Sequence, residues 1–200
     1  KLWSKSNSIT TQAVELFTVG NDKDFDQLLA PYDVLGSIAH VKMLASVSLL
    51  TQSEADLLVK ALQKIYQIVI APAFVIPDGV EDIHSYVELL LTNELGEIGK
   101  KIHSARSRND QVLVDIKLYL RAEIQFLVEQ VIPLFELLQK QSDQYNNHLL
   151  PGYTHLQLAM PSSFGLWFGA YAESLVDDMV QLEAVFQIVN KNPLGSAAGF

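Results

Sequence analysis

Apolar positions recur with helical spacing along most of the chain. Residues 32–50 carry a periodic apolar stripe, which predicts a helix. The stretch TQSE at 51–54 spells a capping box and predicts a second helix that ends near Ile70. After the loop APAFVIPDG, a third helix is predicted over 82–95, where Gly96 would end it.

Two long helices are predicted in the second half. The first runs over about 109–146, with a kink at Pro133. The second begins at Pro161, a residue well suited to the first helical position, and ends near Asn190. Between them, LLPGYTHLQLAM contains a Pro-Gly pair that favours a turn, so a loop or a short extended piece is expected.

These long helices are too apolar for a single buried stripe. In the 27 residues Val112–Leu138, 18 are apolar, not counting proline. A surface helix needs only three or four apolar residues per two turns. The pattern therefore predicts an all-α fold whose long helices form the centre of a bundle, shared between subunits.

Composition narrows the class of protein. The formal net charge is −9, which disfavours a nucleic-acid partner. The chain has no cysteine, so it has no disulfide framework, and a reducing, cytoplasmic compartment is expected. The opening KLWSKSNSIT lacks the apolar core of a signal peptide, and the longest apolar run, at 65–76, is too short to cross a membrane.

A basic segment stands out against the acidic background. It contains Lys100, Lys101, His103, Arg106 and Arg108 and no acid. It ends in Arg-Ser-Arg-Asn, directly before a predicted helix, where cations are unfavourable by about 0.3–1 kcal/mol each. Helix N-terminal amides bind anions, and arginine grips carboxylates with two donors. A solvated positive patch is the competing interpretation, but the position favours an anion site.

Two histidines are candidates for proton transfer or binding. His155 follows Thr154 in PGYTHLQ, and a histidine held in a turn can move protons. His84 and Glu88 are four residues apart on one predicted helix face, so Glu88 could orient His84. A half-buried structural histidine and a surface pair are the alternatives. No metal motif such as HExxH and no Gly-rich phosphate loop occurs, since NPLGSAAGF follows no predicted strand.

Taken together, these segments resemble argininosuccinate lyase, within the fumarase/aspartase superfamily that also includes delta crystallins. The likeness rests on KLW, EDIH, KIHSARSRNDQV, PGYTHLQ and NPLGSAAG, in this order. It implies an all-α, long-helix bundle with an N-terminal helical domain over 1–108 and the first part of the central bundle over 109–200. It also implies a homotetramer in which three chains build each active site.

The resemblance implies cleavage of argininosuccinate to arginine and fumarate, the last step of arginine biosynthesis, without a cofactor or metal. Ser107, Arg108, Asn109 and Thr154 match substrate-binding positions of the family. His155 matches the histidine of its acid/base machinery. His84 is expected to line the site, and Arg106 is expected to brace the loop.

The sequence departs from the family pattern at several places. The serine-bearing loop Ser-Ser-x-Met-Pro-x-Lys-x-Asn does not occur, so the chain is expected to be an N-terminal portion that is inactive alone. Leu158 stands where many members have a basic residue, and Met160 stands where they have glutamine. Asp22 stands where many members have a substrate-contacting serine, and no role is carried over to it.

Two other functions stay open at this stage. The same carboxylate corner would suit another succinyl-group lyase of the superfamily. A non-enzymatic, crystallin-like structural role is the other alternative, favoured by the missing serine loop.

Overall fold

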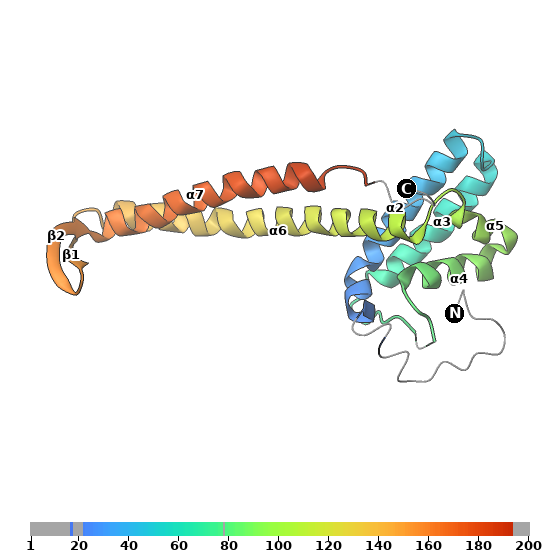
Figure 1. Ribbon diagram of the computed structural model, residues 1–200, viewed down its shortest axis with the longest axis horizontal. Helices are drawn as coiled ribbons and strands as arrows, with labels where there is room; N and C mark the ends of the chain where they lie inside the picture. The colour runs from blue at the N-terminus through green and yellow to red at the C-terminus, as the bar shows by residue number, and fades with distance from the viewer. Residues whose placement is uncertain (1–16, 18–21, 78, 194–200) are drawn as a thin grey trace. The chain divides into compact units, whose positions relative to one another are not determined.

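The computed structural model describes residue 17 and residues 22–77 and 79–193. The chain divides into two compact units, Lys1–Tyr119 with Asn192–Phe200 and Leu120–Lys191 (Figure 1). The division falls inside the longest helix, whereas the expected domain boundary at 108/109 lies at the start of that helix. That boundary stays a prediction about the domains of the protein.

All regular secondary structure among the described residues of the first unit is helical. Its elements are α2 (Asp22–Ser46), α3 (Gln52–Val69), α4 (Ile83–Leu95), the short α5 (Glu97–Lys100), the 3₁₀ turn η1 (Lys101–His103) and the start of α6 (Arg108–Gln144). The predicted stripe at 32–50 therefore belongs to a helix that begins earlier and ends at Ser46.

Local capping explains where the two shorter predicted helices begin and end. The side chain of Thr51 accepts a hydrogen bond from the Glu54 backbone, and the Glu54 carboxylate accepts one from the Thr51 backbone. Asp82 caps α4 by accepting from the Ser85 N–H at 2.8 Å, and Gly96 ends it with φ of 60°. Both predicted helices, with their caps, are confirmed.

One apolar core holds the first unit together. Its fully buried side chains come from α2, α3, α4 and η1 and include Val34, Val41, Leu44, Leu58, Leu62, Ile83, Leu91 and Ile102. Asp33, beside this core on α2, is 1 % exposed, and Asp115 on α6 is 0 % exposed. The packing of these helices thus places two acids in the interior.

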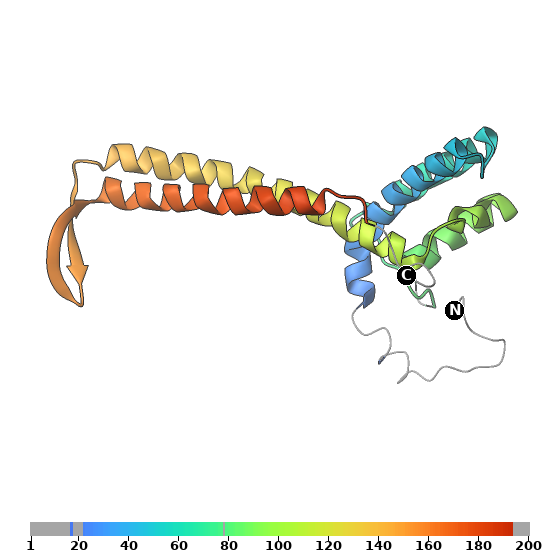
Figure 2. The same cartoon turned by 45° about the horizontal axis from the view of Figure 1, so that its top comes forward.

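The second unit consists of a helical pair and a β-hairpin. It contains the remainder of α6, then β1 (Leu149–Thr154), β2 (Gln157–Ser163) and α7 (Phe164–Val189). The strands pair antiparallel from Leu149 opposite Ser163 to Thr154 opposite Gln157. Figure 2 shows α6 and α7 running side by side within this unit.

The hairpin corrects two predictions. The second long helix does not begin at Pro161, because Pro161 pairs with Pro151 in the strand ladder and Ser163 caps the helix that begins at Phe164. The turn does not lie at Pro-Gly but at His155 and Leu156, whose φ values are 50° and 64°. These positive values at both central residues are typical of a type I′ hairpin turn. The expected extended piece is confirmed.

Large apolar side chains are exposed along the helices of the second unit. They include Phe126 (58 %), Ile132 (51 %), Leu166 (67 %), Val180 (65 %) and Ile188 (60 %). Among the described residues, no helix is long and apolar enough to span a membrane. These side chains therefore form faces suited to contact with other protein surfaces.

Candidate functional site

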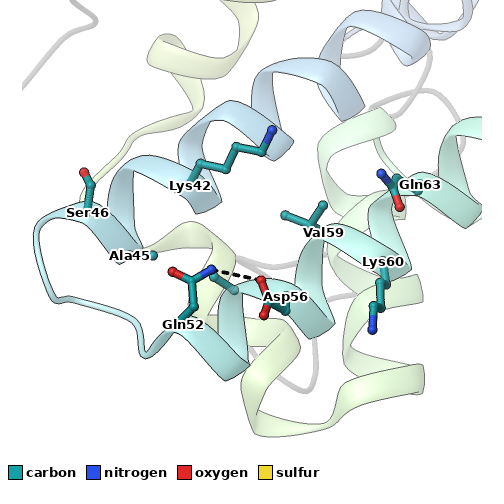
Figure 3. A pocket seen from close by; sticks show the side chains of 9 residues that line it. Lys42, Ala45, Ser46, Gln52, Asp56, Val59, Lys60 and Gln63 are labelled. Carbon is teal, nitrogen blue, oxygen red and sulfur yellow. Dashed lines mark hydrogen bonds between the residues drawn. The ribbon is translucent and has the colours of Figure 1, made fainter.

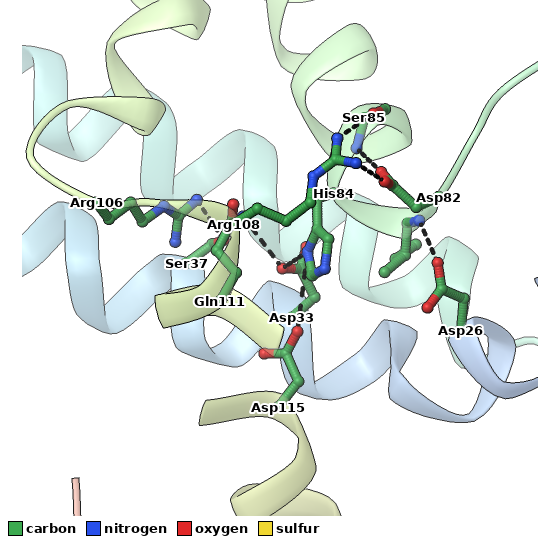
Figure 4. A network of polar contacts seen from close by, with 11 residues as sticks. Asp26, Asp33, Ser37, Asp82, His84, Ser85, Arg106, Arg108, Gln111 and Asp115 are labelled. Carbon is green, nitrogen blue, oxygen red and sulfur yellow. Dashed lines mark hydrogen bonds and ion pairs between the residues drawn. The ribbon is translucent and has the colours of Figure 1, made fainter. Parts of the chain in front are cut away.

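Arg108 opens α6 and is held against the start of α4. Its guanidinium forms an ion pair with the Asp82 carboxylate and donates a hydrogen bond from Nη2 to Ser85 Oγ at 3.2 Å (Figure 4). Asp82 uses its other oxygen to cap α4. The side chain of Arg108 keeps 35 % of its surface exposed, so it can still meet a ligand.

Ser107 and Asp110 cap the N-terminus of α6. The Asp110 carboxylate accepts from the Ser107 N–H at 2.7 Å, and Ser107 Oγ accepts from the Asp110 N–H at 3.4 Å. This reciprocal arrangement satisfies two backbone donors and places an acid in the first turn, where it offsets the two arginines. Asn109 lies exposed on the outer side of the same turn.

Arg106 turns inward. Its Nη2 donates to Ser37 Oγ on α2 at 3.1 Å, and its buried Nε has no hydrogen-bond partner among the described residues. Burial lowers the pKa of Arg106, and the charges of Asp33, Asp115, Glu88 and Asp110 oppose this shift. Arg106 braces the segment, as expected from the sequence.

The segment before α6 has a fixed backbone path. Ala105 has φ of 57°, a left-handed conformation that is unusual for a residue with a Cβ. The imidazole of His40 on α2 bonds through Nε2 to the Ser104 carbonyl oxygen at 2.8 Å. Burial lowers the pKa of His40, partly offset by this bond, so the neutral ring that donates here is favoured. The turn directs Arg106 inward.

His84 is buried, and its partner is Asp33. The Nδ1 of His84 lies 2.7 Å from Asp33 Oδ1, and the residue is 7 % exposed. Asp33, and not the predicted Glu88, is the hydrogen-bond partner of His84 Nδ1. Burial lowers the pKa of His84, but the hydrogen bond and charge of Asp33 and the charge of Asp115 outweigh burial, so the net pKa is raised.

Asp115 completes a buried acid–base cluster, which consists of Asp33, His84, Arg106 and Asp115 (Figure 4). Asp115 Oδ2 lies 3.9 Å from His84 Nδ1, and neither carboxylate oxygen of Asp115 has a hydrogen-bond partner among the described residues. Burial, and next the charge of Asp33, raise the pKa of Asp115 to about 8. Ligand atoms of the two acids and His84 lie within 4.8 Å of one another, as around a cation, but the Arg106 guanidinium already supplies positive charge there.

Neither Asp33 nor Asp115 is predicted as a site residue from the sequence motifs. They are far apart in the chain and fit no motif. One signal was available: Asp115 is an acid inside the apolar run VLVDIKL, and Asp33 lies in a periodic apolar stripe. An acid on a helix face expected to be buried needs a partner, and this marks it as a candidate.

Thr154 and His155 belong to the second unit. Thr154 ends β1, and His155 is the first residue of the turn, with a positive φ. Both side chains are exposed. The candidate residues of the first unit, His84, Ser107, Arg108 and Asn109, are thus gathered around the start of α6, whereas these two lie on the tip of the hairpin.

A shallow groove of about 430 Å³ lies between α2 and α3 (Figure 3). Lys42, Asp56 and Lys60 are among its lining residues, and Gln52 donates to Asp56 at 2.9 Å. It contains none of the candidate residues named above.

Comparison with known proteins gives consistent matches. A family model described as "Lyase" matches residues 7–200. The argininosuccinate lyases of Parabacteroides distasonis and Bacteroides fragilis are 58 % and 59 % identical over all 200 residues, and that of Thermotoga neapolitana is 40 % identical. The chain covers 45 %, 44 % and 50 % of these relatives, so it spans about half their length or less.

Solved structures share the fold. EDDS lyase in complex with formate matches with a TM-score of 0.76 and 23 % identity over 96 % of this chain and 38 % of that one. A fumarate lyase:delta crystallin from Brucella melitensis bound to cobalt matches with a TM-score of 0.74 and 16 % identity, over 89 % of this chain and 43 % of that one. At these identities the likeness concerns the fold alone, and it confirms the predicted fold class.

Proposed function

Because the chain belongs to the lyase family whose model matches residues 7–200, we propose that it is part of an argininosuccinate lyase, which cleaves argininosuccinate to arginine and fumarate. The names of relatives that are 58–59 % identical support this activity. The observation that carries it is the gathering of Ser107, Arg108 and Asn109 at the N-terminus of α6.

The chemistry explains why arginine stands there. A base removes a proton from the carbon beside a carboxylate, the C–N bond breaks, its electrons leave with the guanidinium nitrogen, and the electrons of the C–H bond form the double bond of fumarate. Proton removal places extra negative charge on the neighbouring carboxylate. Fixed donors aimed at that carboxylate stabilise the transition state more than the ground state.

In this proposal each candidate residue has a role. Arg108, Ser107 and Asn109 bind the carboxylate, and His84 lines the site beneath them. Thr154 donates to a substrate oxygen, and His155 moves a proton. The exposed His155, placed on a two-residue turn, suits transfer to a substrate bound from outside the hairpin.

We further propose that the active protein is a homotetramer in which the exposed apolar faces of α6 and α7 form a central bundle. A site shared between subunits would unite the start of α6 with a hairpin tip. The proposed reaction needs no cofactor, and its product places the protein in arginine biosynthesis, in the cytoplasm.

The test is fumarate release from argininosuccinate by the full-length protein. Arg108→Ala should lower kcat/KM by about 100-fold or more, because it removes a charged donor from a developing anion. Lys60→Ala, which removes an exposed cation from α3, is the matched control and should match wild type. Arg108→Ala activity equal to wild type would exclude the proposed site. Release of fumarate from adenylosuccinate but not from argininosuccinate would instead support a different succinyl-group lyase.

A further inference from the structure

The buried acid–base cluster joins four parts of the first unit. Asp33 comes from α2, His84 from α4, Arg106 from the segment before α6, and Asp115 from α6 itself. Each part thus contributes one ionisable side chain to the same buried cluster. In Figure 4 both carboxylates lie on the same side of the His84 ring, and both contacts are to its Nδ1.

Several carboxylate oxygens of this cluster accept no hydrogen bond from the described residues. Asp33 Oδ1 accepts from His84 Nδ1 at 2.7 Å and from Gln111 Nε2 at 3.4 Å. Asp33 Oδ2 and both oxygens of Asp115 have no hydrogen-bond partner among the described residues, although Asp115 is 0 % exposed. A buried carboxylate without a donor is strongly disfavoured unless it is neutralised.

The formal charges of the four side chains show which protonation states leave the cluster neutral. If both acids are ionised and both bases are protonated, the four charges sum to zero. Moving one proton from His84 to Asp115 leaves the opposite charges of Asp33 and Arg106 and again gives zero. The two arrangements differ in whether the imidazole or the Asp115 carboxyl carries one proton. His84 Nδ1 keeps its own proton for Asp33 at 2.7 Å, and Asp115 Oδ2 lies 3.9 Å from that nitrogen, beyond hydrogen-bond distance.

We propose that His84 and Asp115 share one proton, so that Asp115 is a positioning residue that sets the protonation state of His84. Asp115 faces Asp33 and Asp26 of α2, His84 of α4 and Arg106. His84 faces Asp33, Asp115 and the more distant Asp82. No further cation is needed, since Arg106 balances Asp33.

Sharing a proton has a spectroscopic signature. Two groups that interact by more than about one pKa unit titrate in two macroscopic steps, and each group reports both steps. The His84 ring should therefore titrate in two steps, one when the pair binds its second proton and one when it loses its last. Without Asp115, the ring should titrate in a single step.

The experiment is a pH titration of the full-length protein labelled with ¹³C in its histidine rings, followed by NMR. The chain has five histidines, and His84→Gln assigns the His84 signal. Wild type should show two steps, separated by more than about one pH unit. Asp115→Asn, which mimics the protonated acid in shape, should show one step. Asp24→Asn, which removes an exposed acid of α2, is the charge-matched control and should keep both steps.

A single step in wild type would overturn the proposal, and this result is readable even if Asp115→Asn fails to fold. Broadening of the His84 signal by one equivalent of Mn²⁺ would also overturn it, because a cation would then take the place of the proton. The readout concerns the resting protein and no reaction. Its failure is therefore distinct from failure of the proposed lyase activity.

Discussion

Arg106 and Arg108 are two residues apart and meet different environments. The left-handed backbone at Ala105 directs Arg106 into the acid–base cluster, whereas Arg108 stays at the surface on Asp82 and Ser85. The two guanidinium groups thus differ in burial and in their partners. Arg106 donates to Ser37 inside the unit, whereas Arg108 keeps 35 % of its side-chain surface exposed, as its proposed role in carboxylate binding requires.

Asp82 has two separable contacts, and substitution can distinguish them. Asp82→Asn removes the charge that pairs with Arg108 but keeps an N-cap, so it should cost about 1 kcal/mol of stability. Asp82→Ala removes both contacts and should cost about 1 kcal/mol more. Urea unfolding of the two variants and wild type measures the difference. Equal losses would show that the cap contributes nothing.

At this scale the sequence points to the residues of one short motif and to His84, but not to the buried acids that surround His84. Arg108, Ser107 and Asn109 stand in one short motif, so their neighbourhood is local and could be predicted. The pairing of His84 with Asp33 spans 51 residues and depends on how α2 packs against α4, which no spacing within one helix encodes. Spacing within one helix therefore points to Glu88, four residues from His84, and not to Asp33.

Elements were predicted best where capping chemistry is local. Thr51, Asp82 and Gly96 mark helix ends through bonds to residues three or four positions away. The predicted helix start at Pro161 is wrong because proline occurs at strand edges as well as in the first turn of a helix. Pro161 lies in a strand because β2 pairs with β1 across the hairpin, and this pairing cannot be predicted from the pattern of one segment.

The close approach of α7 to α6 gives a prediction at the same scale. A Cβ on Gly165 would lie 2.5 Å from the Ser142 carbonyl oxygen and from Asn146 Cα, so Gly165→Ala must push the helices apart. A loss of about 1–3 kcal/mol is expected. Gly169→Ala, one turn further, would meet only the Ser142 side chain, at 3.2 Å, and should be nearly neutral. Thermal unfolding followed by circular dichroism compares the two; similar losses would contradict the close packing at Gly165.

For the molecule as a whole, each unit has a different reason to be stable. The first unit buries its apolar side chains in its own core. The second has few buried residues, and its α7 buries only Gly165 and Ala172. The excess of apolar residues noted in the sequence is thus unburied within this one chain, and the apolar faces require another surface to cover them.

We therefore expect the full-length protein to associate through these faces. Phe126→Glu and Val180→Glu each place a charge on a side chain that is 58 % or 65 % exposed in the single chain. If α6 and α7 form a central bundle, burial of that charge should shift the protein from tetramer toward smaller species while its helix content is kept. Light scattering coupled to size-exclusion chromatography measures the mass.

Glu183→Gln, at an exposed site of α7, is the control and should leave the mass unchanged. A wild-type monomer, or glutamate variants that remain tetrameric, would show that these faces are not the interface, and the apolar excess of both helices would then need a different partner.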